Sequence, residues 1–497
     1  MIKNIIANFI GRFWSLLSAF LFIPLYIRYL GFESYSVISF TLVIAGIMAV
    51  LDAGLTATLS REFARKDNSS EDKLNVFKTL ESSYFIIIGI SIFIVFSLSG
   101  AIANHWLNVK SYQPEQISLF LKIISFDIGF QLLLRFYIGG LLGLEKQVEA
   151  NFYQVGWGMF RNGFVVVALL FYPSLNVFFC WQTISTIIFT FLIKLALEYK
   201  LVGKYSFNFV FRVDQKILKR IWKFAGGMLL ISLIAAINTQ LDKLAISKFL
   251  SLDSLGYYTL AIAVAQVLIV LANPISTALL PRFTSLYSEK RIVDASILFQ
   301  RITVFVSILV FALMANMSFF SKELIFIWTG DISIAKRVAT FLPIISFSMS
   351  MLSLALLPYT IAIANGYTKL NNVLGIVSLF VTLPGYWFAT RIFGAIGAAS
   401  VFCGVQVMTT IIYLYFINRK FLHLSIFRFI FFKSLLFPLF ISLLVTYVFS
   451  IIPVFFENSR IEMLLWIGLS TFITLLASLL ILVPVKTIRS LLNSRSF

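Results

Sequence analysis

The chain has 497 residues, of which 60% are hydrophobic and only 12% are charged. A soluble globular protein carries about 25% charged residues, so this composition excludes a soluble domain of any size. The net charge of +19 does not indicate nucleic-acid binding, because no basic stretch forms a folded module with an element that reads a groove.

Apolar runs recur along the whole chain. Each is about 20 residues long, the length that spans a hydrocarbon core. Lipid offers the backbone no hydrogen-bond partners, and the runs are too continuous for barrel strands, so they predict helices. We therefore expect an all-α polytopic membrane protein with about fourteen transmembrane helices. The expected spans are 9–30, 35–59, 83–104, 117–143, 152–172, 175–197, 224–250, 255–280, 302–320, 338–364, 371–391, 395–417, 430–452 and 462–485.

The Lys and Arg residues indicate the orientation of these spans. About two-thirds of them lie in the loops that share a side with the N-terminus, and cytoplasmic loops carry the excess of positive charge. We therefore expect both termini in the cytoplasm. The first run follows Lys3 and lacks a small-residue cleavage site, which favours an uncleaved first helix over a signal peptide.

The longest inner loop ends in a basic segment at residues 212–224 with apolar residues at helical spacing. This pattern is typical of an amphipathic helix on the inner leaflet. A simple extension of the seventh span explains the same pattern equally well.

Three pairs of segments resemble each other at an offset near 222 residues, in the same order. Residues 55–61 match 276–282, a Tyr, Gly and Lys pattern at 137–146 matches 359–369, and 179–193 matches 402–417. Six helices separate the members of each pair, so the repeats are parallel. We expect an N-lobe at 1–200 (helices 1–6), the basic loop at 201–223, a C-lobe at 224–420 (helices 7–12) and two extra helices at 421–497.

The sequence contains no constellation of catalytic or metal-ligating residues. We therefore expect no enzymatic activity and no metal or other cofactor. The informative residues are instead ionisable groups in or near the spans, since such groups usually face a bundle interior and mark a pathway. The basic ones include Arg12, Arg135, Arg161 and Lys243, and the acidic ones are Asp52, Asp127 and Asp242. Their weakly basic balance suits a bulky anion better than an organic cation.

Each of these residues also has a structural interpretation. Arg12 and Arg28 lie close enough to the membrane boundaries to extend their charged ends into water. Asp127 and Arg135 share one helix face and could neutralise each other as a structural pair. Arg161 has no acidic neighbour within its own helix, which favours a functional role for it.

Residues 24–31 (PLYIRYLG) and 51–61 (LDAGLTATLSR) resemble the opening of the polysaccharide transporter family, whose best-known members are the O-antigen flippases. Residues 366–369 (GYTK) and 393–399 (FGAIGAA) resemble the later helices of the same family. The resemblance covers most of the chain. The family belongs to a superfamily that also contains multidrug exporters and peptidoglycan-precursor flippases, and the two extra helices are better matched by the latter branch.

The resemblance implies two six-helix lobes around a central cavity in the bacterial cytoplasmic (inner) membrane. It implies export of an undecaprenyl-pyrophosphate-linked oligosaccharide by alternating access, by a monomer that works beside a polysaccharide polymerase and a chain-length regulator. Basic residues that line the cavity in helices 1, 2, 7 and 8 would meet the diphosphate, and Arg12, Arg28 and Lys243 fall on those helices. Arg135 and Arg161 lie on helices 4 and 5 instead and are substrate candidates from their place within the spans. Asp52, Asp127 and Asp242 are the candidates for coupling an ion.

The predicted function is thus flipping of a lipid-linked oligosaccharide from the inner to the outer leaflet. A cation-coupled multidrug exporter of the same fold remains an alternative. A membrane-embedded glycan polymerase or glycosyltransferase is a second alternative, although the short outer loops and the lack of a catalytic cluster count against it.

Overall fold

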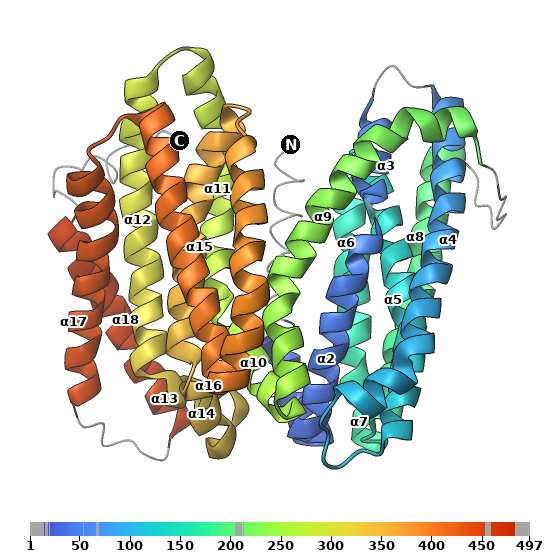
Figure 1. The fold of residues 1–497 in the computed structure, drawn as a ribbon, viewed down its shortest axis with the longest axis horizontal. Helices are drawn as coiled ribbons and strands as arrows, with labels where there is room; N and C mark the ends of the chain where they lie inside the picture. The colour runs from blue at the N-terminus through green and yellow to red at the C-terminus, as the bar shows by residue number, and fades with distance from the viewer. Residues whose placement is uncertain are drawn as a thin grey trace. The chain divides into compact units, whose positions relative to one another are not determined.

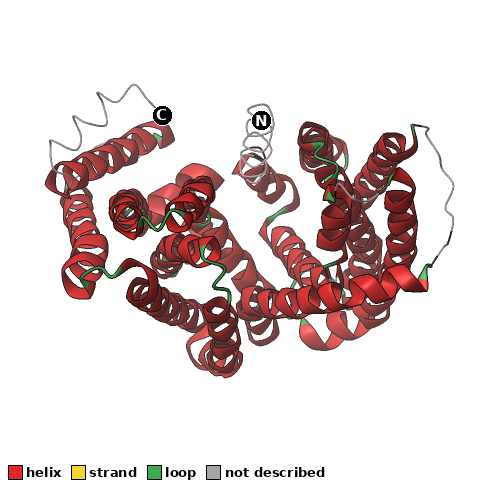
Figure 2. Cartoon of the chain, turned by 90° about the horizontal axis from the view of Figure 1, so that it is seen from above, coloured by secondary structure: helices red, strands yellow, loops and turns green. Residues whose placement is uncertain are grey.

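The computed structural model describes residues 14, 18, 20–52, 54–65, 69–203, 211, 213–452 and 459–482, without the side chains at 220–228, 230, 231 and 426–430. Its described secondary structure is helical, with no strand among these residues (Figures 1 and 2). This confirms the predicted all-α class. The chain divides into two compact units, Met1–Gly256 and Tyr257–Phe497.

The first unit is built around α5, which packs against α4, α8 and α3. Its elements are an apolar helix at Phe20–Leu30, α2 (Phe32–Met48), the 3-10 turn η1 (Ala49–Asp52), α3 (Leu55–Ala64), α4 (Ser70–Ala101), the π turn η2 (Ile102–Trp106), α5 (Pro114–Gly143), α6 (Gln147–Gly158), the π turn η3 (Met159–Gly163), α7 (Phe164–Phe171), α8 (Leu175–Val202) and α9 (Gln215–Phe249). Figure 1 shows this bundle in blue to green.

In the second unit, α15 packs against α11, α12 and α16, and α12 contacts α17 and α18. Its elements are most of α10 (Leu252–Ala265), α11 (Val267–Ser288), α12 (Ile292–Phe319), α13 (Ser321–Thr329), α14 (Ile332–Ala339), α15 (Leu342–Ala364), α16 (Lys369–Ile417), the π segments η4 (Asn418–Leu422) and η5 (Ile426–Leu436), α17 (Phe437–Ile451) and α18 (Arg460–Leu482). The division into two six-helix repeats stays a prediction.

Eleven of the described helices are long and apolar enough to cross a membrane. One of them, at Lys369–Leu422, is long enough for two spans. Gly394, with φ 64° and ψ −149°, breaks this helix between the predicted spans 371–391 and 395–417. Two further helices correspond to the remaining predicted spans. They are the shorter apolar helix Phe20–Leu30 and the 35-residue α9. A topology of about fourteen spans is therefore consistent with the structure.

Helix α9 incorporates the described part of the basic segment predicted as a separate amphipathic helix. It begins after Asp214, whose carboxylate accepts hydrogen bonds from the backbone amides of Lys216 and Ile217. The Asp214 amide donates to Thr79 of α4 at 3.4 Å, and Ile217 packs against the core of the first unit. The segment is thus continuous with the seventh span, as the alternative interpretation proposed.

Two glycines allow α5 to lie against α3 at very short range. A Cβ at Gly139 would come within 2.5 Å of the Thr56 side chain, and one at Gly143 within 2.5 Å of the Ser60 carbonyl oxygen. A helix pair this close depends on positions without side chains. The approach brings Thr56, and with it the adjoining η1 turn, against the last turns of α5.

Candidate functional site

A buried ion pair joins two helices of the first unit. Arg161 donates through Nη1 to Oδ1 of Asp127 at 2.6 Å and through Nη2 to Oδ2 at 2.8 Å. Thr186 of α8 accepts from Arg161 and donates to Asp127, both at 2.6 Å, and Gln131 donates to Oδ2 of Asp127 at 2.8 Å. These four residues are called the Arg161 network. Its bidentate geometry gives strong charge-assisted hydrogen bonds.

The π turn η3 presents Arg161 to this network. Side chains donate to three successive carbonyls of the turn: Trp181 to Phe160 at 2.9 Å, Gln182 to Arg161 at 3.1 Å, and Tyr26 to Asn162 at 2.6 Å. These bonds stabilise the wide turn, a feature that often occurs at functional sites. The face of Trp157 also lies 5.3 Å from the guanidinium, close enough for a cation–π interaction.

The structure identifies the partner of Asp127. Arg135 on the same helix was one possible partner, but the carboxylate pairs with Arg161, which lies 34 positions away. The Arg161 side chain is only 10% exposed and its charge is compensated by Asp127. Arg135 is exposed instead, on the same helix as Asp127.

Asp52 ends the η1 turn between α2 and α3, so the predicted continuous span 35–59 is broken there. Its Oδ1 accepts from the hydroxyl of Thr56 at 2.5 Å and from the hydroxyl of Tyr84 on α4. Tyr84 therefore links the half-buried Asp52 carboxylate to α4.

The remaining candidates are spread along the first unit. Asp242 is buried, and its carboxylate lies 3.7 Å from the ammonium of Lys243, which also donates to the Thr239 carbonyl at 2.6 Å. Arg28 is exposed. Arg12 lies outside the described residues.

A second buried network surrounds Lys194, which lies near the end of the predicted span 175–197. Its ammonium lies 3.0 Å from Glu81 of α4 and 3.7 Å from Glu198, and Tyr137 of α5 donates to Glu81 at 2.5 Å. The Lys194 side chain is only 1% exposed, since three helices enclose it. The four-residue spacing of Lys194 and Glu198 was the available signal for this network, and it was missed. These four residues are called the Lys194 network.

A protein-family model described as "Polysaccharide biosynthesis protein" matches residues 1–287, more than half of the chain. The chain belongs to this family. A second model, described as MatE, matches residues 228–388. The family assignment agrees with the resemblance seen in the opening motifs.

Individual relatives agree with this assignment. A protein of Shigella flexneri described as "Putative O-antigen transporter" is 22% identical over 407 residues, which cover 80% of this chain and 93% of that protein. The fold is similar to that of the lipid II flippase MurJ in an inward closed conformation, with a TM-score of 0.75 and 17% identity over 99% of this chain and 100% of that one.

A multidrug resistance MATE family transporter of the MOP superfamily, in an inward-facing conformation, has a TM-score of 0.64 and 14% identity. The match covers 83% of this chain and 94% of that one. This member of the polysaccharide biosynthesis family therefore shares its fold with MOP-superfamily transporters and is a polytopic membrane protein.

Proposed function

We propose that the protein is a flippase that moves an undecaprenyl-pyrophosphate-linked oligosaccharide from the inner to the outer leaflet. Membership of the polysaccharide biosynthesis family carries this proposal. The name of the Shigella flexneri relative and the similarity to the fold of a lipid II flippase support it. The membrane would be the bacterial inner membrane with both termini in the cytoplasm, and a polysaccharide polymerase and a chain-length regulator would act on the product.

Arg135 is the best-supported candidate for binding the diphosphate. Its position is eight residues before the last residue of α5, Gly143, or about 12 Å along the helix. An exposed guanidinium at such depth is costly against lipid, which favours a water-filled pathway as its surroundings. Arg28 and Lys243 are further candidates on the same unit. Arg161 is less suited to this role, because both carboxylate oxygens of Asp127 already bind its guanidinium.

Asp52 is the corresponding candidate for ion coupling. It is half-buried and accepts from two hydroxyl groups, whereas Asp127 is enclosed in the Arg161 network. A cation or proton that reached Asp52 would alter its bonds to Thr56 and Tyr84.

A deletion strain tests the proposed function directly. The strain should accumulate lipid-linked repeat units on the inner leaflet and lose surface glycan, and the wild-type gene should restore both. R135A should restore less surface glycan than wild type at equal protein level, while R391A, which removes an exposed arginine of the second unit, should restore it fully. A deletion strain with normal surface glycan and no accumulated lipid-linked units would refute the proposal.

Cation-coupled multidrug export is the second candidate, because the MatE model matches residues 228–388. It predicts drug resistance on overexpression and unchanged lipid-linked intermediates in the deletion strain. The two functions therefore give opposite results in the same strain.

A further inference from the structure

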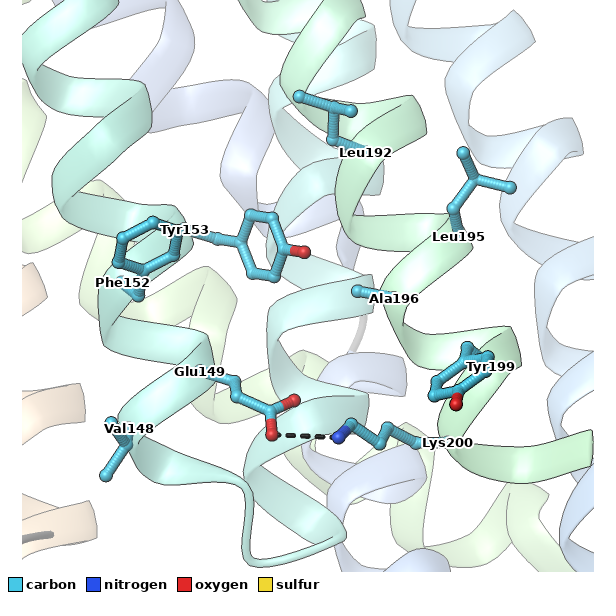
Figure 3. A pocket seen from close by; sticks show the side chains of 9 residues that line it. All are labelled: Val148, Glu149, Phe152, Tyr153, Leu192, Leu195, Ala196, Tyr199 and Lys200. Carbon is cyan, nitrogen blue, oxygen red and sulfur yellow. Dashed lines mark ion pairs between the residues drawn. The ribbon is translucent and has the colours of Figure 1, made fainter. Parts of the chain in front are cut away.

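A groove of about 470 Å³ lies between α6 and α8 in the first unit (Figure 3). This volume falls within the range of about 300–1,000 Å³ that is typical of small-molecule sites. None of the residues discussed above as candidates for substrate or ion lines it. The groove is thus separate from the proposed transport pathway residues.

One end of the groove is polar. Glu149 and Lys200 form an ion pair at 2.9 Å, with side chains that are 38% and 30% exposed. Glu149 lies in the first turn of α6 and Lys200 in the last turn of α8. Because both helices are candidate spans, this pair lies where the membrane meets water.

The rest of the lining is apolar. Phe152, Leu192 and Ala196 lie one to two turns farther from the helix ends, towards the membrane interior. Figure 3 shows Tyr153 reaching from α6 towards Ala196, whose small side chain leaves room in the middle of the groove. Phe152 is 73% and Leu192 43% exposed, so the groove opens along an apolar face of the unit.

We propose that this groove binds a phospholipid with a primary ammonium headgroup, such as phosphatidylethanolamine. Its ammonium would bind Glu149, its phosphate would bind Lys200, and an acyl chain would lie over Ala196 between Phe152 and Leu192. The order of polar and apolar lining matches the order of headgroup and chain. Exchanging the exposed Glu149–Lys200 pair for two pairs with the lipid costs little, since such ion pairs contribute little stability.

The same geometry discriminates between lipid headgroups. An anionic lipid without an ammonium would bring its phosphate close to Glu149 and leave that carboxylate without a partner. Phosphatidylcholine carries a quaternary ammonium, which has no N–H to donate to the carboxylate. We therefore expect binding to phosphatidylethanolamine to be about tenfold tighter than to phosphatidylcholine, the order expected for one charge-assisted hydrogen bond.

Native mass spectrometry of the detergent-solubilised full chain tests this site, with phosphatidylethanolamine, phosphatidylcholine and phosphatidylglycerol added in separate titrations. E149Q should reduce the preference for phosphatidylethanolamine to less than about threefold, by loss of the charged acceptor. A196W should weaken all three lipids, because the indole fills the groove. A101W places the same side chain at an exposed position of α4 and should behave as wild type.

The exchanged variant E149K/K200E separates recognition from misfolding, because it keeps one carboxylate and one ammonium at the rim. It should retain the preference that E149Q loses. Equal binding of the three lipids, a preference for phosphatidylglycerol, an unchanged preference in E149Q, or an unchanged affinity in A196W would overturn the proposal. A polyprenyl substrate tail in the groove would instead give A196W a transport defect without any headgroup preference in the wild type.

Discussion

Asp127 on α5 and Arg161 in the η3 turn hold each other through two parallel hydrogen bonds of 2.6 and 2.8 Å, in surroundings where Asp127 is 1% exposed. Thr186 completes the contact from α8. Two charges that each would be costly in a membrane interior therefore compensate one another, and the pair connects three helical segments of the first unit.

Breaking this pair should strongly destabilise the protein. R161A and D127A each leave one buried charge without its partner, so each should cost about 3–5 kcal/mol. The apolar double variant D127L/R161M should recover much of this loss, because no charge remains buried. Thermal unfolding of the purified protein, followed by the monodisperse fraction, measures the effect. Single variants as stable as the double variant would contradict it.

The Lys194 network should show graded sensitivity. K194M leaves Glu81 and Glu198 facing each other without a cation and should lower stability by about 3–5 kcal/mol. Y137F removes one hydrogen bond to Glu81 and should cost about 1–2 kcal/mol. The same unfolding measurement compares them, and a larger loss for Y137F than for K194M would show that the charge is not what the network depends on.

The close contact of α3 and α5 gives a matched pair of glycine substitutions. G143A places a Cβ within 2.5 Å of the Ser60 carbonyl oxygen, so we expect a loss of about 1–3 kcal/mol from overpacking. G89A adds a Cβ where no atom lies within 4 Å, on α4 of the same unit. It should be neutral or slightly stabilising, as alanine favours helix more than glycine does. Equal melting temperatures for the two variants would exclude the close contact.

Asp52 and Tyr84 should matter for transport more than for folding. D52N removes the charge but keeps an oxygen that can accept from Thr56 and Tyr84. We expect D52N to lower surface glycan at least tenfold while its unfolding midpoint changes little, since a coupling step is lost and the packing is kept. Y84F should give a smaller defect. Transport by D52N at the wild-type rate would remove Asp52 from the coupling step.

The sequence predicted the helices much better than the contacts between their polar side chains. Apolar runs determine spans directly, and even the break at Gly394 separates two spans that were expected there. The partner of Arg161 was not predictable, because helical periodicity relates only residues of one helix and Asp127 lies on another. The burial of Lys194 was not predicted either, because a position near the end of a span suggests exposure, whereas packing against α4 and α5 buries the side chain.

The wide turn at Met159–Gly163 also affects how this chain is compared with others. A π turn contains one residue more than the α-helical turn it replaces, so residues after it are rotated by about 100° relative to a regular helix. A relative with an uninterrupted helix here would need a one-residue gap in the alignment. Without that gap, every position of α7 is assigned to the wrong side of the helix.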